Sequence, residues 1–206
     1  MCNARSFGLP IATAFVVIAC LALLFAPEEV AGWLAFDCQA ILGGQVWRLW
    51  TGHFEHFSVQ HALVDTIVLF LAGAVAEREL GTPRVGLAFL VGAPAISLGL
   101  LILAPEMSYY RGASGLSMLA AVAGGIALWR SRPGLRLFLV ACGSFLALKV
   151  LLEIFGLSLD MANLPKTVQV AWQVHFLGSA LGWITGFYGQ RQSCLELNTA
   201  RHLLPG

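Results

Sequence analysis

Five ionisable side chains interrupt long apolar runs of this chain. They are His61, Asp65, Lys149, Glu153 and His175. Ionisable groups are costly inside a membrane, and they usually face a protein interior or a water-filled site where they have a function. Their occurrence within apolar segments therefore predicts a buried polar site built from several helices.

A candidate nucleophile lies in the sequence Gly112-Ala113-Ser114-Gly115. Glycine permits a tight turn and a close approach of a substrate backbone. We expect Ser114 to begin a helix, where free backbone N–H groups can stabilise a developing oxyanion. A serine hydroxyl also needs a general base, and His175 is our candidate. The sequence places no acid where it would orient that imidazole, so we expect a Ser–His dyad rather than a triad.

The composition indicates that lipid surrounds the elements carrying these residues. Hydrophobic residues make up 58% of the 206 residues and charged residues only 11%, whereas a soluble domain carries about 25% charged residues. Six apolar runs approach the roughly 20 residues that span a membrane as a helix. They are residues 7–26, 57–76, 85–104, 113–129, 135–157 and 168–188. We therefore predict an all-α membrane protein with a six-transmembrane-helix bundle, and we expect the first helix to be retained.

The basic residues predict the orientation of this bundle. Most of the arginines fall in segments that are cytoplasmic if the N-terminus is inside, which is the usual bias of membrane proteins. We expect both termini in the cytoplasm, a single domain over residues 1–190, and a short cytoplasmic tail over residues 191–206. With this orientation, His61, Ser114 and His175 all lie in the outer half of the membrane.

A stripe of small residues predicts which helices pack together. Gly178, Gly182 and Gly186 recur every four residues after His175, and small faces let membrane helices approach closely. The fourth helix offers a possible matching surface, comprising Ala120, Ala121, Gly124 and Gly125. Close packing of the fourth and sixth helices would bring Ser114 to His175.

Charge and cysteine content argue against other classes of function. The net charge is +1, so the chain lacks the basic surface that binds nucleic-acid phosphates. The cysteines are scattered without a CxxC pair, and no HExxH motif is present, which gives no support to a redox or zinc site. We expect neither a metal nor a cofactor.

Together these motifs resemble the rhomboid family of intramembrane serine proteases. The chain has Gly44-Gln45-Val46-Trp47-Arg48, similar to the family's GxxWR. It then has His56-x4-His61-x3-Asp65, similar to HxxxxHxxxN, followed by GxSG at residues 112–115 and HxxGxxxG at residues 175–182. The resemblance implies that Ser114 is the nucleophile and His175 the base, and that His61 and the Ser114 N–H contribute to the oxyanion hole. It implies substrates that are single-span membrane proteins, cleaved near the outer face of a bacterial-type inner membrane.

Two features set the chain apart within that resemblance. Asp65 replaces the family's asparagine, and an ionised carboxylate cannot donate to an oxyanion. We therefore expect Asp65 to orient His61. Lys149 and Glu153 are four residues apart on one face of the fifth helix, which predicts an internal ion pair. This pair resembles the rhombosortase branch, whose substrates carry a C-terminal Gly-Gly-containing membrane anchor, and implies a role for Glu153 in recognising substrate or acceptor.

The residues also leave other functions open. A catalytically inactive rhomboid-like protein that binds membrane clients is the main alternative, because fold does not fix function. His61 and His175 could instead ligate a haem as a bis-imidazole pair, but that leaves the GxSG motif without a role. A transporter is a further alternative, although no paired halves are evident.

Overall fold

The computed structural model describes residues 8–157 and 172–202, with side chains described as far as residue 189. Six long helices form its body: α1 (Ile11–Leu23), α5 (Val59–Leu80), α6 (Thr82–Leu103), α7 (Ser114–Ser131), α8 (Arg136–Ile154) and α9 (Trp172–His202). Short elements connect them: α2 (Glu28–Leu34), β1 (Phe36–Asp37), α3 (Cys38–Leu42), α4 (Arg48–Thr51), β2 (Tyr109–Tyr110) and η1 (Pro133–Leu135).

Each of the six predicted apolar runs overlaps one of the long helices. Three stretches are long and apolar enough to cross a membrane: Val59–Leu80, Thr82–Leu103 and Pro133–Ile154. Helix α1 is shorter but also apolar. The chain is therefore a multi-pass membrane protein, and the number of spans stays a prediction. Residue 7 and residues 168–171 of the predicted runs lie outside the described residues, and α9 continues past its predicted end at residue 188 to His202.

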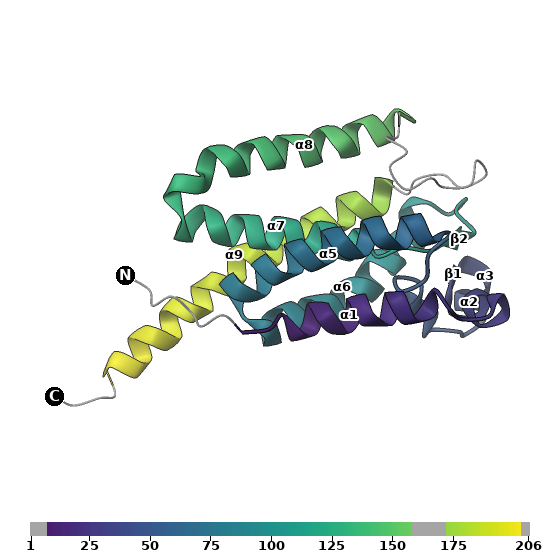
Figure 1. The fold of residues 1–206 in the computed structure, drawn as a ribbon, viewed down its shortest axis with the longest axis horizontal. Coiled ribbons are helices and arrows are strands. Elements are labelled where there is room, and N and C mark those ends of the chain that lie inside the picture. The colour runs from purple at the N-terminus through teal and green to yellow at the C-terminus, as the bar shows by residue number, and fades with distance from the viewer. Residues whose placement is uncertain (1–7, 158–171, 203–206) are drawn as a thin grey trace.

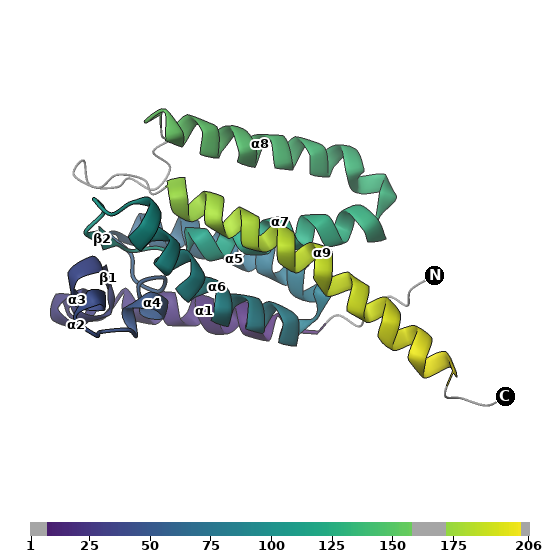
Figure 2. The same cartoon turned by 180° about the vertical axis from the view of Figure 1, so that it is seen from behind.

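The helices form a bundle with α7 at its centre. Helix α7 packs chiefly against α9 and α5, while α1 packs against α5 and α6. Figures 1 and 2 show α8 lying along one side, separated from the other helices over most of its length. The start of α1 and the end of α9 lie at the same end of the bundle, and the short elements α2, α3, β1 and β2 gather at the other end (Figure 1).

Helix α8 has few buried side chains. Only 6% of its most apolar stretch is buried, against 39% for the corresponding stretches of α5 and α6. An apolar helix that is exposed nearly all round is suited to lipid contact. The main contacts of α8 with the bundle are made with α7 and α9.

The glycine stripe of α9 packs directly on the backbone of α7. A Cβ at Gly182 would lie 2.5 Å from the carbonyl oxygen of Leu119, and one at Gly186 would lie 2.8 Å from that of Ala123. A Cβ at Gly178 would collide with the carbonyl oxygen of Gly115. The predicted packing of these two helices is confirmed.

The prediction of which face of α7 makes this contact is wrong. Gly124 packs against Ala76 of α5 instead, and Gly125 meets no neighbouring atom within 4 Å. The physical reason is the helical period: a stripe at every fourth residue that begins at Gly115 continues through residues 119 and 123, and it leaves 124 and 125 on other faces.

The segment between α1 and α5 folds into short elements that brace the loop before α7. Strand β1 pairs antiparallel with β2, with Phe36 opposite Tyr110. The buried Arg48 guanidinium donates to the carbonyl oxygens of Gly32 and Ala35 at 2.8 and 2.6 Å. These bonds satisfy carbonyl groups at the C-terminal end of α2. The pairing with β1 holds residues 109 and 110 in place ahead of Ser114.

Candidate active site

Ser114 is the first residue of α7, as predicted. Its side chain is half-buried, and Ala113 occupies the N-cap position. The first N–H groups of an α-helix have no acceptor within the helix, and they carry the positive end of the helix dipole. This position combines a partly accessible hydroxyl with backbone donors that can stabilise an anion.

Gly112 fits its position for two independent reasons. Its φ of +149° lies in the region that side-chain-bearing residues rarely adopt. A Cβ there would also lie 3.2 Å from Asp65 Oδ2 and from the His61 ring. The loop before Ser114 can therefore approach His61 and Asp65 only because residue 112 has no side chain.

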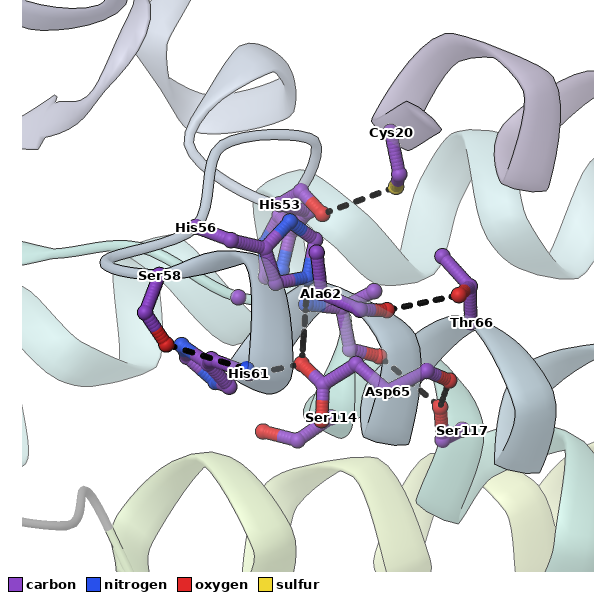
Figure 3. Close-up of polar contacts among 12 residues, drawn as sticks. Cys20, His53, His56, Ser58, His61, Ala62, Asp65, Thr66, Ser114 and Ser117 are labelled. Carbon is purple, nitrogen blue, oxygen red and sulfur yellow. Dashed lines mark hydrogen bonds and ion pairs between the residues drawn. The ribbon is translucent and has the colours of Figure 1, made fainter. Parts of the chain in front are cut away.

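Asp65 gathers three partners around one carboxylate oxygen. Its Oδ2 accepts a hydrogen bond from the Ala113 N–H at 2.9 Å, and it lies 3.3 Å from His56 Nε2 and 3.4 Å from His61 Nε2. Figure 3 shows Asp65 with His61 and Ser114 close to it. Asp65 thus contacts the backbone of the residue that precedes Ser114, a contact that the sequence did not reveal.

The two histidine rings beside Asp65 lie edge to face. The centroids of His56 and His61 are 5.0 Å apart, and the Nδ1 atoms of both rings are buried without a hydrogen-bond partner within the described part of the chain. The predicted proximity of His61 to Asp65 is present. His56 was seen in the sequence only as part of a motif, and the fold brings its ring to the same carboxylate.

Tyr110 is a site residue that sequence reasoning missed. Its hydroxyl donates to the Gly112 carbonyl oxygen at 2.5 Å and lies 3.5 Å from Ser114 Oγ. Burial is the main cause that raises the pKa of the Tyr110 hydroxyl above its ordinary value, so the group stays protonated. A single tyrosine two residues before the motif has no spacing pattern that would have identified it.

His175 lies in the first turn of α9, close to the start of α7. The adjacent Val174 packs against Gly115, where a Cβ would come within 2.5 Å of Val174 Cγ1. His175 itself is 5% exposed. No hydrogen bond joins Ser114 to His175 in the part of the chain that the structure describes. Catalytic hydrogen bonds are often long or absent before substrate binds, so this geometry is compatible with a dyad.

Lys149 and Glu153 form the ion pair that their spacing predicts, near the end of α8. The pair does more than hold α8, because Glu153 Oε2 lies 2.6 Å from His175 Nδ1. Lys149 Nζ lies 3.2 Å from the same nitrogen. The expectation that no acid is available to orient His175 is therefore corrected. The acid is 22 residues away in sequence and on another helix, where local spacing cannot reveal it.

Comparison with known proteins gives two findings. A family model described as the Rhomboid domain matches residues 43–192. Rhomboid protease GlpG of Salmonella choleraesuis (strain SC-B67) is 32% identical over 77 residues, which cover 35% of this chain and 28% of that relative. The same-named protein of Salmonella typhi is 31% identical over 77 residues, with the same coverage. The chain thus spans less than a third of the length of these curated relatives.

Proposed function

Because the chain belongs to the rhomboid family, we propose that it is an intramembrane serine endopeptidase that cleaves membrane-anchored proteins. Ser114 is the nucleophile and His175 the general base. One observation carries this proposal: the glycine contacts between α7 and α9 hold the N-terminal ends of both helices together, at Gly115, Val174 and Gly178. The nucleophile and base positions therefore belong to one rigid contact between two helices.

In the proposed reaction, His175 removes the Ser114 proton as Oγ attacks the scissile carbonyl carbon. The backbone N–H of Ser114, at the start of α7, stabilises the oxyanion. His61 contributes to the same oxyanion hole. The proton then passes from His175 to the leaving amide nitrogen as the C–N bond breaks, which leaves an acyl-enzyme. Water hydrolyses this ester in a second step.

The substrates that fit this site are single-span membrane proteins. The site lies at the end of the bundle where α2, α3, β1 and β2 gather (Figure 1), and a substrate helix must unwind before its carbonyl reaches Ser114. Glycine or proline near that end of the substrate lowers the cost of unwinding. We expect Gly→Leu changes near the cleavage site to slow cleavage of a single-span reporter, and equal cleavage rates would contradict this.

The Lys149–Glu153 pair supports a narrower substrate class, as in the rhombosortase branch. We propose that proteins with a C-terminal Gly-Gly-containing anchor are processed preferentially. Two reporters that differ only in this anchor test the proposal when they are incubated with the purified enzyme. Equal processing of a Gly-Gly anchor and an ordinary single-span anchor would contradict the narrower class.

We place the protein in a bacterial-type inner membrane with both termini cytoplasmic. The arginine distribution supports this orientation, and the start of α1 and the end of α9 lie at one end of the bundle (Figure 1). Protection of a C-terminal tag from protease added outside spheroplasts is the expected result. Digestion of the tag would show that the C-terminus lies outside, contrary to the proposed orientation.

Labelling by a fluorophosphonate probe tests the catalytic assignment. The detergent-purified wild type is expected to be labelled, and folded Ser114→Ala and His175→Ala are expected to lose labelling. Labelling that survives Ser114→Ala would mean that another residue is the nucleophile. A folded wild type without labelling would favour the client-binding alternative.

A further inference from the structure

We propose that Glu153 is a positioning residue that orients His175, so that the site works as a Ser114–His175–Glu153 arrangement rather than a dyad. This inference rests on the proposed protease function. Its basis is the 2.6 Å contact between Glu153 Oε2 and His175 Nδ1, which joins two buried side chains. Contacts of this length between a carboxylate and an imidazole are charge-assisted hydrogen bonds.

The contact determines which imidazole nitrogen carries a proton. An ionised carboxylate only accepts hydrogen bonds, so Nδ1 of His175 must donate to Glu153. In neutral imidazole the other nitrogen, Nε2, is then the acceptor. His175 is thereby held in the tautomer that can take the Ser114 proton. When Nε2 receives that proton, the resulting imidazolium lies against the Glu153 carboxylate, which stabilises its charge.

Lys149 supports Glu153 rather than His175. Its ammonium pairs with Glu153 Oε1 and lies 3.2 Å from His175 Nδ1. An ammonium group has no acceptor lone pair, so it cannot accept the proton that Nδ1 presents. The shorter contact, from Nδ1 to the carboxylate, is therefore the hydrogen bond. Lys149 compensates the charge of Glu153 from the partly exposed side, where its side chain is 28% exposed against 4% for Glu153.

The surroundings of Glu153 argue that its contact is specific. Within α8, which the structure describes throughout, Glu153 is the one buried residue. The rest of the helix is largely exposed, and Figure 2 shows α8 lying apart from the bundle over most of its length. A carboxylate is expensive to bury without partners. Its burial against His175 is therefore explained by the two partners that it finds there.

The test is the rate of fluorophosphonate labelling in detergent, without a protein substrate. The probe reacts with the activated serine and makes no use of a substrate helix. We expect Glu153→Gln to lower the second-order labelling rate constant by about 100-fold or more, a loss typical of impaired general-base catalysis. Glu106→Gln, an exposed change outside the site, serves as the matched control and is expected to label like the wild type.

The outcomes separate this inference from the proposed function. Wild-type labelling of Glu153→Gln, with Ser114→Ala silent, would overturn the positioning role and leave the protease assignment standing. If that variant also lost cleavage of Gly-Gly-anchored substrates, Glu153 would be a recognition residue instead. If Glu153→Gln does not fold, the labelling rate of Glu153→Asp tests the inference instead. The shorter aspartate side chain retracts the carboxylate from His175 Nδ1. Labelling at least tenfold slower than the wild type supports the inference, and an unchanged rate contradicts it.

Discussion

Asp65 holds the backbone that precedes Ser114, the proposed nucleophile. Its Oδ2 accepts from the Ala113 N–H at 2.9 Å, which is a bond that an asparagine side-chain oxygen can also accept. We therefore expect Asp65→Asn to retain fluorophosphonate labelling within about tenfold of the wild type, because each kcal/mol lost from one hydrogen bond changes a rate only several-fold. The measurement is the labelling rate constant together with the thermal midpoint.

Asp65→Leu is the matched variant that cannot accept this bond. It leaves the buried Ala113 N–H without its carboxylate acceptor, at a cost of about 1–3 kcal/mol. We expect lower stability and slower labelling than in Asp65→Asn. Complete loss of labelling in a folded Asp65→Asn variant would show that the charge itself is required, and that the contact with Ala113 is secondary.

At the scale of single residues, the sequence identifies the candidate reactive residues more readily than it identifies their partners. Ser114, His61 and Asp65 have recognisable spacing, and the fold brings His61 to Asp65 and Asp65 to the residue before Ser114. The partners Tyr110 and Glu153 were missed because their contacts depend on three-dimensional placement. Glu153 reaches His175 only through the rotation of α8 about its axis and its axial offset against α9. Neither quantity is encoded in a local pattern.

Among the helices, the contact between α7 and α9 controls the distance between Ser114 and His175. A Cβ at Gly182 would lie 2.5 Å from the Leu119 carbonyl oxygen and 3.0 Å from the Leu119 Cα. Since both atoms belong to the backbone, α9 itself must shift. We expect Gly182→Ala to destabilise the protein by about 1–3 kcal/mol, as overpacking does. Labelling should slow as well, because the two reactive side chains move apart.

Gly143→Ala on α8 is the control for this change. A Cβ there meets no neighbouring atom within 4 Å, and alanine favours a helix interior over glycine by about 0.5–1 kcal/mol. We expect an unchanged or slightly higher thermal midpoint. If Gly182→Ala were as stable and as active as Gly143→Ala, the close approach of α7 and α9 would not be what positions the site.

The sequence predicts the helices better than the faces by which they meet. Apolar length was enough to find all six, because backbone groups in lipid must pair within a helix. The face of α7 was predicted wrongly because alanine and glycine occur all around this helix, including Gly124 against α5. The short elements α2 to α4 have no recognisable pattern in the sequence, since segments this short show no periodicity.

At the scale of the whole molecule, buried polar groups connect the turn between α4 and α5 to helix α6. His53, in the turn between α4 and α5, is fully buried, and its Nε2 lies 2.9 Å from the Ala93 carbonyl oxygen and 3.1 Å from Ser97 Oγ, both in α6. Burial is the main cause that lowers the pKa of His53 from 6.5 to about 4. The folded protein therefore holds His53 neutral at a pH where the unfolded chain protonates it.

This difference predicts how stability depends on pH. Between pH 6.5 and about 4 the unfolded state binds one more proton at His53 than the folded state, so stability falls as the pH falls through this window. The loss is about 3 kcal/mol over the whole window. His53→Gln keeps an N–H donor for Ala93 but does not titrate, so its thermal midpoint should fall less than that of the wild type between these pH values. Carboxylates that titrate in the same range are common to both proteins and cancel in the comparison. Parallel midpoint curves for the two proteins would show that His53 can be protonated without opening the turn that lies against α6.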